Sequence, residues 1–96
     1  MVSFNDIKNQ RDKIAELAEK RGVRNIRVFG SFARGDADEN SDLDLLVTMD
    51  GDRSLLDRIG FMHDVEDLLH IKVDVVNENA LHHSIREEVI KDGVAL

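Results

Sequence analysis

The stretch GSFARGDADENSDLDLLV, residues 30–47, decides how the rest of this 96-residue chain is interpreted. Its apolar end predicts a strand that opens on two aspartates. Successive side chains of a strand point to opposite faces, so Asp42 and Asp44 share one face, about 6 to 7 Å apart, and the leucines share the other. Two carboxylates on one face repel each other unless a cation lies between them, and magnesium suits such oxygen ligands best.

The first half of the stretch has the composition of a phosphate-binding turn. It follows a predicted strand over residues 25–29. Gly30 lets a ligand approach the backbone because it has no Cβ, and Ser31 is expected to cap a short helix whose free N–H groups bind phosphate. A phosphate cradle placed a few residues before a metal-binding Asp-x-Asp is what nucleotidyl transfer from a nucleoside triphosphate requires.

These residues resemble the signature of the DNA polymerase beta-like nucleotidyltransferase superfamily: a Gly-Ser pair, a further Gly and then Ser-Asp-x-Asp-Leu. The variant Gly-Ser-x-Ala-Arg-Gly, residues 30–35, and the short chain are most similar to the minimal nucleotidyltransferase (MNT) proteins, the antitoxins of HEPN/MNT toxin–antitoxin pairs. The resemblance implies that Gly30 and Ser31 bind the triphosphate, and that Asp42, Asp44 and a third carboxylate hold two Mg²⁺ ions.

Three further residues complete the site that the resemblance implies. Asp74, in the middle of a strand predicted over residues 71–76, is the candidate for the third carboxylate, because an unpaired carboxylate there needs a cation, a donor cluster or an exposed edge. An ion pair with Lys72 or another nearby base stays open as the alternative. Arg34 is expected to contact phosphate or to brace the acidic loop. Ser41, the serine of the Ser-Asp-x-Asp-Leu signature, is assigned to the nucleotide site with it.

Two other loop signatures fail on the same stretch. Gly30 and Gly35 have the glycine spacing of a P-loop, but Asp36 and Ala37 stand where the lysine and the Ser/Thr are required. An EF-hand that starts at Asp36 has Val47 in place of the bidentate glutamate. A solvated loop whose acids only cap turns explains the early aspartates of the stretch, but not the pair that begins an apolar strand.

Composition indicates one small domain over residues 1–96, with 42% hydrophobic residues for its core. Cysteine is absent, and the sequence has neither a signal-peptide core nor an apolar run of membrane-spanning length, so we expect a cytoplasmic protein. A net charge of −7 disfavours direct binding to nucleic acid. Seven acids and no Lys or Arg lie in residues 36–52, so a triphosphate could approach only with metal ions.

The remaining pattern predicts an α/β fold, a small mixed sheet of three to four strands packed with helices, as in the polymerase beta-like nucleotidyltransferase core. Helices are expected over residues 4 to about 21, 55–70 and 80 to about 92, a polar turn over 49–53, and a terminal strand or intermolecular contact over 94–96. The last helix should turn Leu81, Ile85 and Val89 inward. Helix 55–70 is apolar over more than one stripe, which fits burial on two sides or a partner surface. The histidines have no spacing typical of a metal site.

The resemblance implies a metal-dependent nucleotidyltransferase that acts as an antitoxin by transferring AMP from ATP to a tyrosine hydroxyl of a cognate HEPN ribonuclease toxin. Its catalytic and metal-binding candidates are Asp42, Asp44 and Asp74, with Mg²⁺ as cofactor and ATP as substrate. Two alternatives stay open: a contact-only antitoxin with weak or no catalysis, and the nucleotide-binding half of a split small-molecule nucleotidyltransferase. Whether the protein forms a homo-oligomer or a hetero-oligomer with the toxin also stays open.

Overall fold

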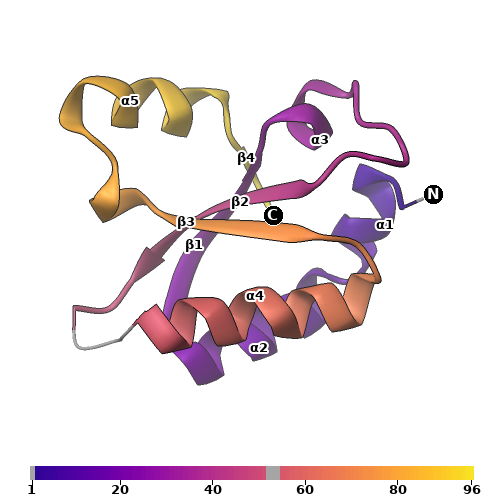
Figure 1. Ribbon diagram of the computed structural model, residues 1–96, viewed down its shortest axis with the longest axis horizontal. Helices are drawn as coiled ribbons and strands as arrows, with labels where there is room; N and C mark the ends of the chain where they lie inside the picture. The colour runs from indigo at the N-terminus through magenta and orange to yellow at the C-terminus, as the bar shows by residue number, and fades with distance from the viewer. Residues whose placement is uncertain (1, 52–54) are drawn as a thin grey trace.

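The computed structural model describes residues 2–51 and 55–96, and these form a mixed sheet with helices on both sides (Figure 1). The elements in chain order are α1 (Phe4–Asn9), α2 (Arg11–Arg21), β1 (Val23–Phe29), α3 (Ser31–Arg34), β2 (Leu43–Met49), α4 (Leu55–Leu69), β3 (Val73–Asn77), the 3-10 helix η1 (Glu78–Ala80), α5 (His83–Asp92) and β4 (Val94–Ala95). The predicted α/β class and mixed sheet are confirmed. No helix within the described ranges has the length and apolar content to cross a bilayer.

The strand order is β3-β2-β1-β4 among the described residues. β3 runs parallel to β2, whereas β1 runs antiparallel to both β2 and β4. The register places Phe29 opposite Asp44 and Asp44 opposite Asp74. Because residues that pair directly point to the same face, these three side chains form a row across three strands, which we call the carboxylate row.

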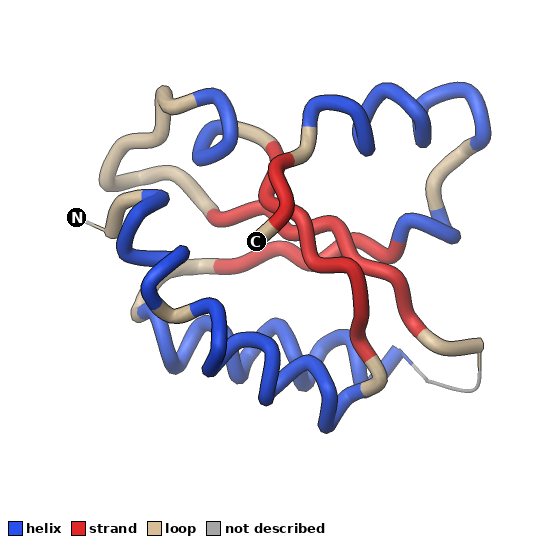
Figure 2. Tube along the Cα trace, turned by 180° about the vertical axis from the view of Figure 1, so that it is seen from behind, coloured by secondary structure: helices blue, strands red, loops and turns tan. Residues whose placement is uncertain are grey.

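One face of the sheet is the core. α2 and α4 lie along this face, as the two long helices on one side of the strands in Figure 2 show. The strand residues that point toward them alternate with those of the carboxylate row and are fully buried: Val28, Leu43, Leu45, Val47 and Val75. Phe61 of α4 is also fully buried. Burial of this apolar surface supplies the main stabilisation of the fold.

The other face is only partly covered, by α3 and α5 (Figure 1). α5 contains no buried residue, and Ile85 is 47% exposed. The predicted inward packing is therefore wrong for Ile85, whereas Val89 is half-buried and lines a cavity with Phe29, and the half-buried Leu81 lies before α5 begins. Ile85 is exposed because α5 lies over the polar face of the sheet, where a charged cluster rather than a full apolar stripe holds the helix.

That charged cluster surrounds Glu78, which is 9% exposed. Its carboxylate lies 3.6 Å from Arg27 Nη1 of β1 and 3.9 Å from Arg86 Nη2 of α5, and it accepts a hydrogen bond from the Thr48 hydroxyl of β2. A buried carboxylate needs such partners. The cluster therefore links α5 to two strands.

Several element boundaries differ from the prediction. The helix expected over residues 4 to 21 is broken at Gln10, which ends α1 by donating to Ile7 O at 3.0 Å. Gly22, with φ 70°, ends α2 so abruptly that β1 begins at Val23. α5 starts only at His83, because the side chain of His82 caps it. β4 confirms the terminal strand, and the turn expected over 49–53 falls partly outside the described residues.

Side chains of α4 cover the outer edge of β3. The Val73 N–H donates to Glu66 Oε2 at 3.0 Å, and Arg58 Nη1 donates to Val75 O at 2.7 Å. The bond from Val73 is also the main reason that the pKa of Glu66 lies below its ordinary value. Backbone groups that another strand could use are thus already paired.

Candidate active site

β1 ends in a turn that only glycine accommodates. Gly30 has φ 73° and ψ −149°, a combination that side-chain-bearing L residues rarely adopt. A Cβ at this position would overlap Oδ2 of Asp44 and lie 3.2 Å from its Cγ. The sequence suggested that Gly30 leaves room for a ligand, but the space that its Cβ would enter is occupied by the Asp44 carboxylate. The glycine therefore lets the turn and the carboxylate occupy adjoining space.

The turn leads directly into α3. Gly30 is the N-cap residue and no side chain caps the helix, so the prediction that Ser31 caps it is wrong. Ser31 is the first helical residue, because the non-helical backbone angles that an N-cap requires are those of Gly30. The helix ends after one turn at Gly35, which has φ 83° and whose N–H bonds to Ser31 O at 3.0 Å.

The three predicted carboxylates interact on the open face. Asp44 is half-buried in β2, Asp74 is exposed in β3, and Asp42 is exposed one residue before β2 begins. Burial raises the pKa of Asp44, and the negative charges of Asp74 and Asp42 raise it further, whereas Arg34 opposes them. The described residues contain no ion pair between Asp74 and Lys72, so that alternative has no support in the structure.

The donor chemistry of this face fits a hard divalent cation. Its candidate ligands are carboxylate oxygens, and the pKa of Asp44 is raised first by burial and then by the charges of Asp74 and Asp42, against the opposing effect of Arg34. Within residues 2–51 and 55–96, no three Asp, Glu, His or Cys side chains already lie close enough together to enclose one ion. Asp42, Asp44 and Asp74 are the residues that would hold Mg²⁺ if a nucleotide supplied further oxygens.

Arg34 and Ser41 lie in the loop between the turn and the carboxylates. Arg34 Nε lies 3.3 Å from Asp36 Oδ2, and both side chains are exposed. Of the two roles expected for Arg34, contact with phosphate or support of the acidic loop, this ion pair agrees with the second. Ser41 Oγ accepts from the Asp38 N–H at 2.9 Å and donates to Asp38 Oδ1 at 3.3 Å. Its hydroxyl is therefore engaged in the loop, and its assignment to the nucleotide stays a prediction.

A cavity of about 530 Å³ lies beside the turn. Its lining comes from the end of β1, from α3 and from α5, and consists of Phe29, Gly30, Ala33, Arg34, Val89 and Asp92. Sequence reasoning did not assign Val89 or Asp92 to the site, because nothing in the motif indicates where α5, which begins only at His83, will pack.

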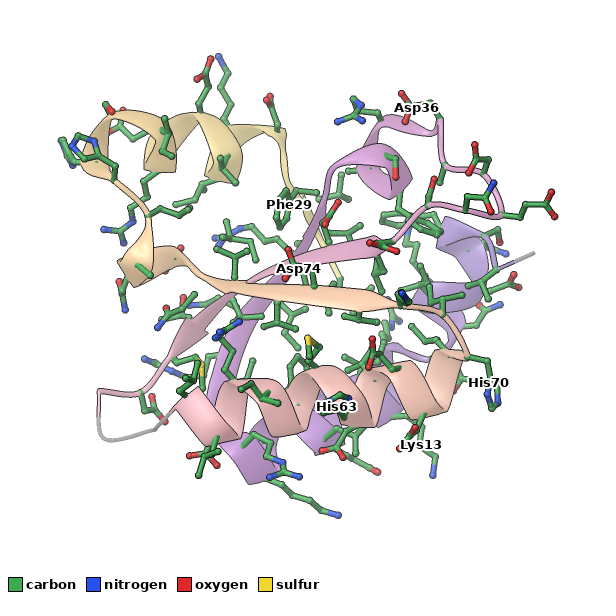
Figure 3. All side chains as sticks on the ribbon, viewed as in Figure 1. Lys13, Phe29, Asp36, His63, His70 and Asp74 are labelled. Carbon is green, nitrogen blue, oxygen red and sulfur yellow. The ribbon has the colours of Figure 1, made fainter. Side chains whose placement is uncertain are left out.

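The two sides of the sheet separate cleanly in Figure 3. Phe29 and Asp74 lie on the side toward α3 and α5, whereas His63 and Lys13 belong to the helices on the opposite side. The carboxylate row and the cavity thus share one face of the molecule.

Comparison with known proteins agrees with this geometry. The family model described as "Nucleotidyltransferase domain" matches residues 7–96. The protein adenylyltransferase MntA of Thermococcus cleftensis is 43% identical over 79 residues, which are 82% of this chain and 80% of the relative. A provisionally named protein adenylyltransferase of Methanocaldococcus jannaschii is 33% identical over 93 residues, 97% of each chain.

Solved structures share the fold. One provisionally described as a minimal nucleotidyltransferase superposes with a TM-score of 0.90 at 38% identity, covering 99% of this chain and 97% of the other. A chain of a toxin–antitoxin complex with AMP-PNP gives 0.74 at 23% identity, covering 88% and 69%. A chain of the complex of a tri-AMPylated Shewanella oneidensis HEPN toxin with its MNT antitoxin gives 0.67 at 19% identity, covering 92% and 69%. With the carboxylate row, the Gly30 turn and these matches, the chain belongs to the nucleotidyltransferase domain family and is a nucleotidyltransferase with the minimal form of that fold.

Proposed function

We propose that this nucleotidyltransferase transfers AMP from ATP to a tyrosine hydroxyl of a HEPN ribonuclease toxin and thereby acts as its antitoxin. The observation that carries the proposal is the register that pairs Asp44 with Asp74 beside the Gly30 turn. A phosphate held at that turn lies next to the carboxylates. The proposal is supported by relatives named protein adenylyltransferases and by fold neighbours that are MNT antitoxins in complex with HEPN toxins.

The chain's own groups act mainly by positioning. Backbone N–H groups at residues 30 and 31 bind phosphate oxygens of ATP, and Asp42, Asp44 and Asp74 would hold Mg²⁺. When bound, the metal neutralises phosphate charge and lowers the pKa of the acceptor hydroxyl. The acceptor oxygen forms a bond to the α-phosphorus, the bond to pyrophosphate breaks, and an aspartate of the row takes the hydroxyl proton.

The acceptor comes from another chain. This sequence contains no tyrosine, so self-modification on tyrosine is impossible within it. Any AMP–tyrosine adduct formed in a mixture of the two proteins is therefore located on the partner. This makes the reaction simple to assign by peptide mass spectrometry.

The test converts Asp42 and Asp44 together to Asn. Transfer of labelled AMP to a cognate HEPN protein should fall to background, because the proposed metal ligands are lost. The folded variant should be as stable as wild type or more stable by roughly 0.5 to 2 kcal/mol, since repulsion between the carboxylates is relieved. Urea unfolding, labelled-ATP transfer and a pull-down on one preparation measure the three properties.

The matched control removes two exposed acids from α2 on the other side of the sheet, Glu16→Gln with Glu19→Gln, which should leave transfer intact. Transfer at the wild-type rate by the Asp42 and Asp44 double variant would defeat the enzymatic proposal. Loss of transfer with continued neutralisation of the toxin would favour the contact-only antitoxin.

A further inference from the structure

We propose that the cavity between β1, α3 and α5 holds the nucleoside part of the nucleotide, and that Asp92 accepts a hydrogen bond from it. The inference rests on the proposed function, because it takes the phosphates to lie at the Gly30 turn. It makes α5, a helix with no part in the sequence motif, a wall of the substrate site.

The position of the cavity is the first argument. A nucleoside is covalently joined to its α-phosphate, so it has to lie directly beside the group that holds the phosphates. Of the cavities in the described part of the chain, the one of about 530 Å³ is lined by Gly30. A larger one, of about 710 Å³, is lined by residues of α1, of the acidic loop and of the end of α4, and Gly30 is not among them. The volume beside the turn lies within the range of roughly 300 to 1,000 Å³ typical of small-molecule sites.

The chemistry of the lining is the second argument. Phe29, Ala33 and Val89 provide apolar lining, and Phe29 is the aromatic residue among them, the type of side chain on which nucleobases stack. The charged residues differ in placement, because Arg34 follows the phosphate turn directly whereas Asp92 comes from α5. A carboxylate repels phosphate, so Asp92 suits the uncharged part of a nucleotide.

Asp92 is chemically available for this role. Within residues 2–51 and 55–96 it has no hydrogen-bond or ion-pair partner, and its side chain is exposed to the cavity and to solvent. An ionised carboxylate accepts hydrogen bonds and donates none. It therefore recognises a donor on the nucleoside, either a ribose hydroxyl or an exocyclic amine of the base.

The wall that α5 provides is held in a defined place. Arg86 of α5 and Arg27 of β1 both contact the buried Glu78, and Gly93 brings the end of α5 so close to Arg27 that a Cβ on the glycine would lie 3.3 Å from Cβ of the arginine. A binding site needs such supporting contacts to keep its geometry. The charged cluster supplies them for a helix that has no buried residue.

A bulky substitution that fills the cavity tests whether the nucleoside binds there. We expect Val89→Trp to weaken binding of Mg²⁺–ATP by about tenfold or more, as loss of base stacking predicts, and to leave binding of Mg²⁺–tripolyphosphate within about twofold. Ile85→Trp is the matched control, because it adds the same ring to an exposed position of α5 that does not line the cavity. Titration calorimetry gives the dissociation constants, and thermal melts verify that each variant is folded.

Removing the acceptor tests Asp92. Asp92→Ala should weaken ATP binding about tenfold, whereas Glu88→Gln on the same helix should not change it. Titrations with 2′-deoxy-ATP, 3′-deoxy-ATP and inosine triphosphate distinguish the sources of the donor. The analogue that lacks the donor should bind wild type more weakly, and Asp92→Ala should abolish that difference.

The outcomes separate this inference from the proposed function. If Val89→Trp and Asp92→Ala bind ATP as wild type does, or if wild type binds tripolyphosphate as tightly as ATP, the nucleoside lies elsewhere and the inference is overturned. If the variants weaken ATP binding as expected but wild type transfers no AMP to the partner, the cavity stands and the proposed function fails.

Discussion

The two faces of the sheet are built from alternate residues of the same strands, yet one is sealed and the other carries charge. On the face under α2 and α4, Leu43, Leu45 and Val47 are completely buried. On the face under α3 and α5, Asp44 of the same strand is half-buried and pairs across the sheet with an exposed Asp74. The difference shows how one strand contributes both to stability and to the site. Neighbouring side chains of a strand point to opposite faces, so Leu45 packs in the core while Asp44 lies on the open face.

The largest expected loss of stability comes from substitutions on the buried face under α2 and α4. Leu45→Ala removes a fully buried side chain and should lower the free energy of unfolding by about 2 to 5 kcal/mol, whereas Asp44→Ala, one residue away, should lower it by less than about 1 kcal/mol or raise it. Urea unfolding with a common m-value measures both. Equal losses from the two variants would mean that the open face is as structural as the core.

An intermediate effect is expected at the turn, where backbone strain and the carboxylate act together. Gly30→Ala should lower the free energy of unfolding by more than about 2 kcal/mol, because it adds a collision with Asp44 to the strain of a positive φ. Gly35→Ala is the control, since its φ is 83° but no atom lies within 4 Å of the added Cβ, and it should show the strain of about 1 to 2 kcal/mol alone.

A double-mutant cycle then isolates the collision. In an Asp44→Ala background, Gly30→Ala should be no more destabilising than Gly35→Ala. The same loss in both backgrounds would show that Asp44 moves aside freely and that only the backbone requires glycine at this position.

The smallest effect should appear in the pH dependence of stability. The folded-state pKa of Asp44 lies above its ordinary value of 3.8, so the native state is disfavoured once the carboxylate ionises. Asp44→Asn should therefore be more stable than wild type near pH 7, and this advantage should disappear as the pH falls through the raised pKa toward 3.8. The effect is modest because the carboxylate is still partly open to water. Urea unfolding from pH 3 to 8 measures it, and an advantage that grows on acidification would contradict the assignment.

The parts of the site that could be predicted from sequence are those that local geometry determines. Alternation along β2 separates Asp44 from Leu45, and a carboxylate in the middle of the next apolar strand indicated Asp74. The structure shows that β3 is the neighbour of β2 and that Asp44 and Asp74 pair directly, a register that was not predicted. Their roles as metal ligands stay predictions.

The parts that could not be predicted depend on contacts between distant segments. That the Asp44 carboxylate occupies the space a Cβ of Gly30 would enter follows from the pairing of β1 with β2, which one sequence does not reveal. The place of α5 depends on a buried Glu78 whose partners come from β1, β2 and α5. The periodicity of apolar residues predicted apolar packing for this helix, because periodicity reports only their spacing. It gives no information about the charge of the surface against which the helix packs.

The two hydrogen bonds from side chains of α4 to the backbone of β3 also bear on self-association through the edge of the sheet. A sheet with a free outer strand can be lengthened by a neighbour's strand, and repetition of that step builds filaments. Here Arg58 and Glu66 occupy backbone groups that such a neighbour would need, and β4, at the other end of the sheet, is only two residues long. The helix that covers the core therefore also hinders the addition of a strand at the β3 edge.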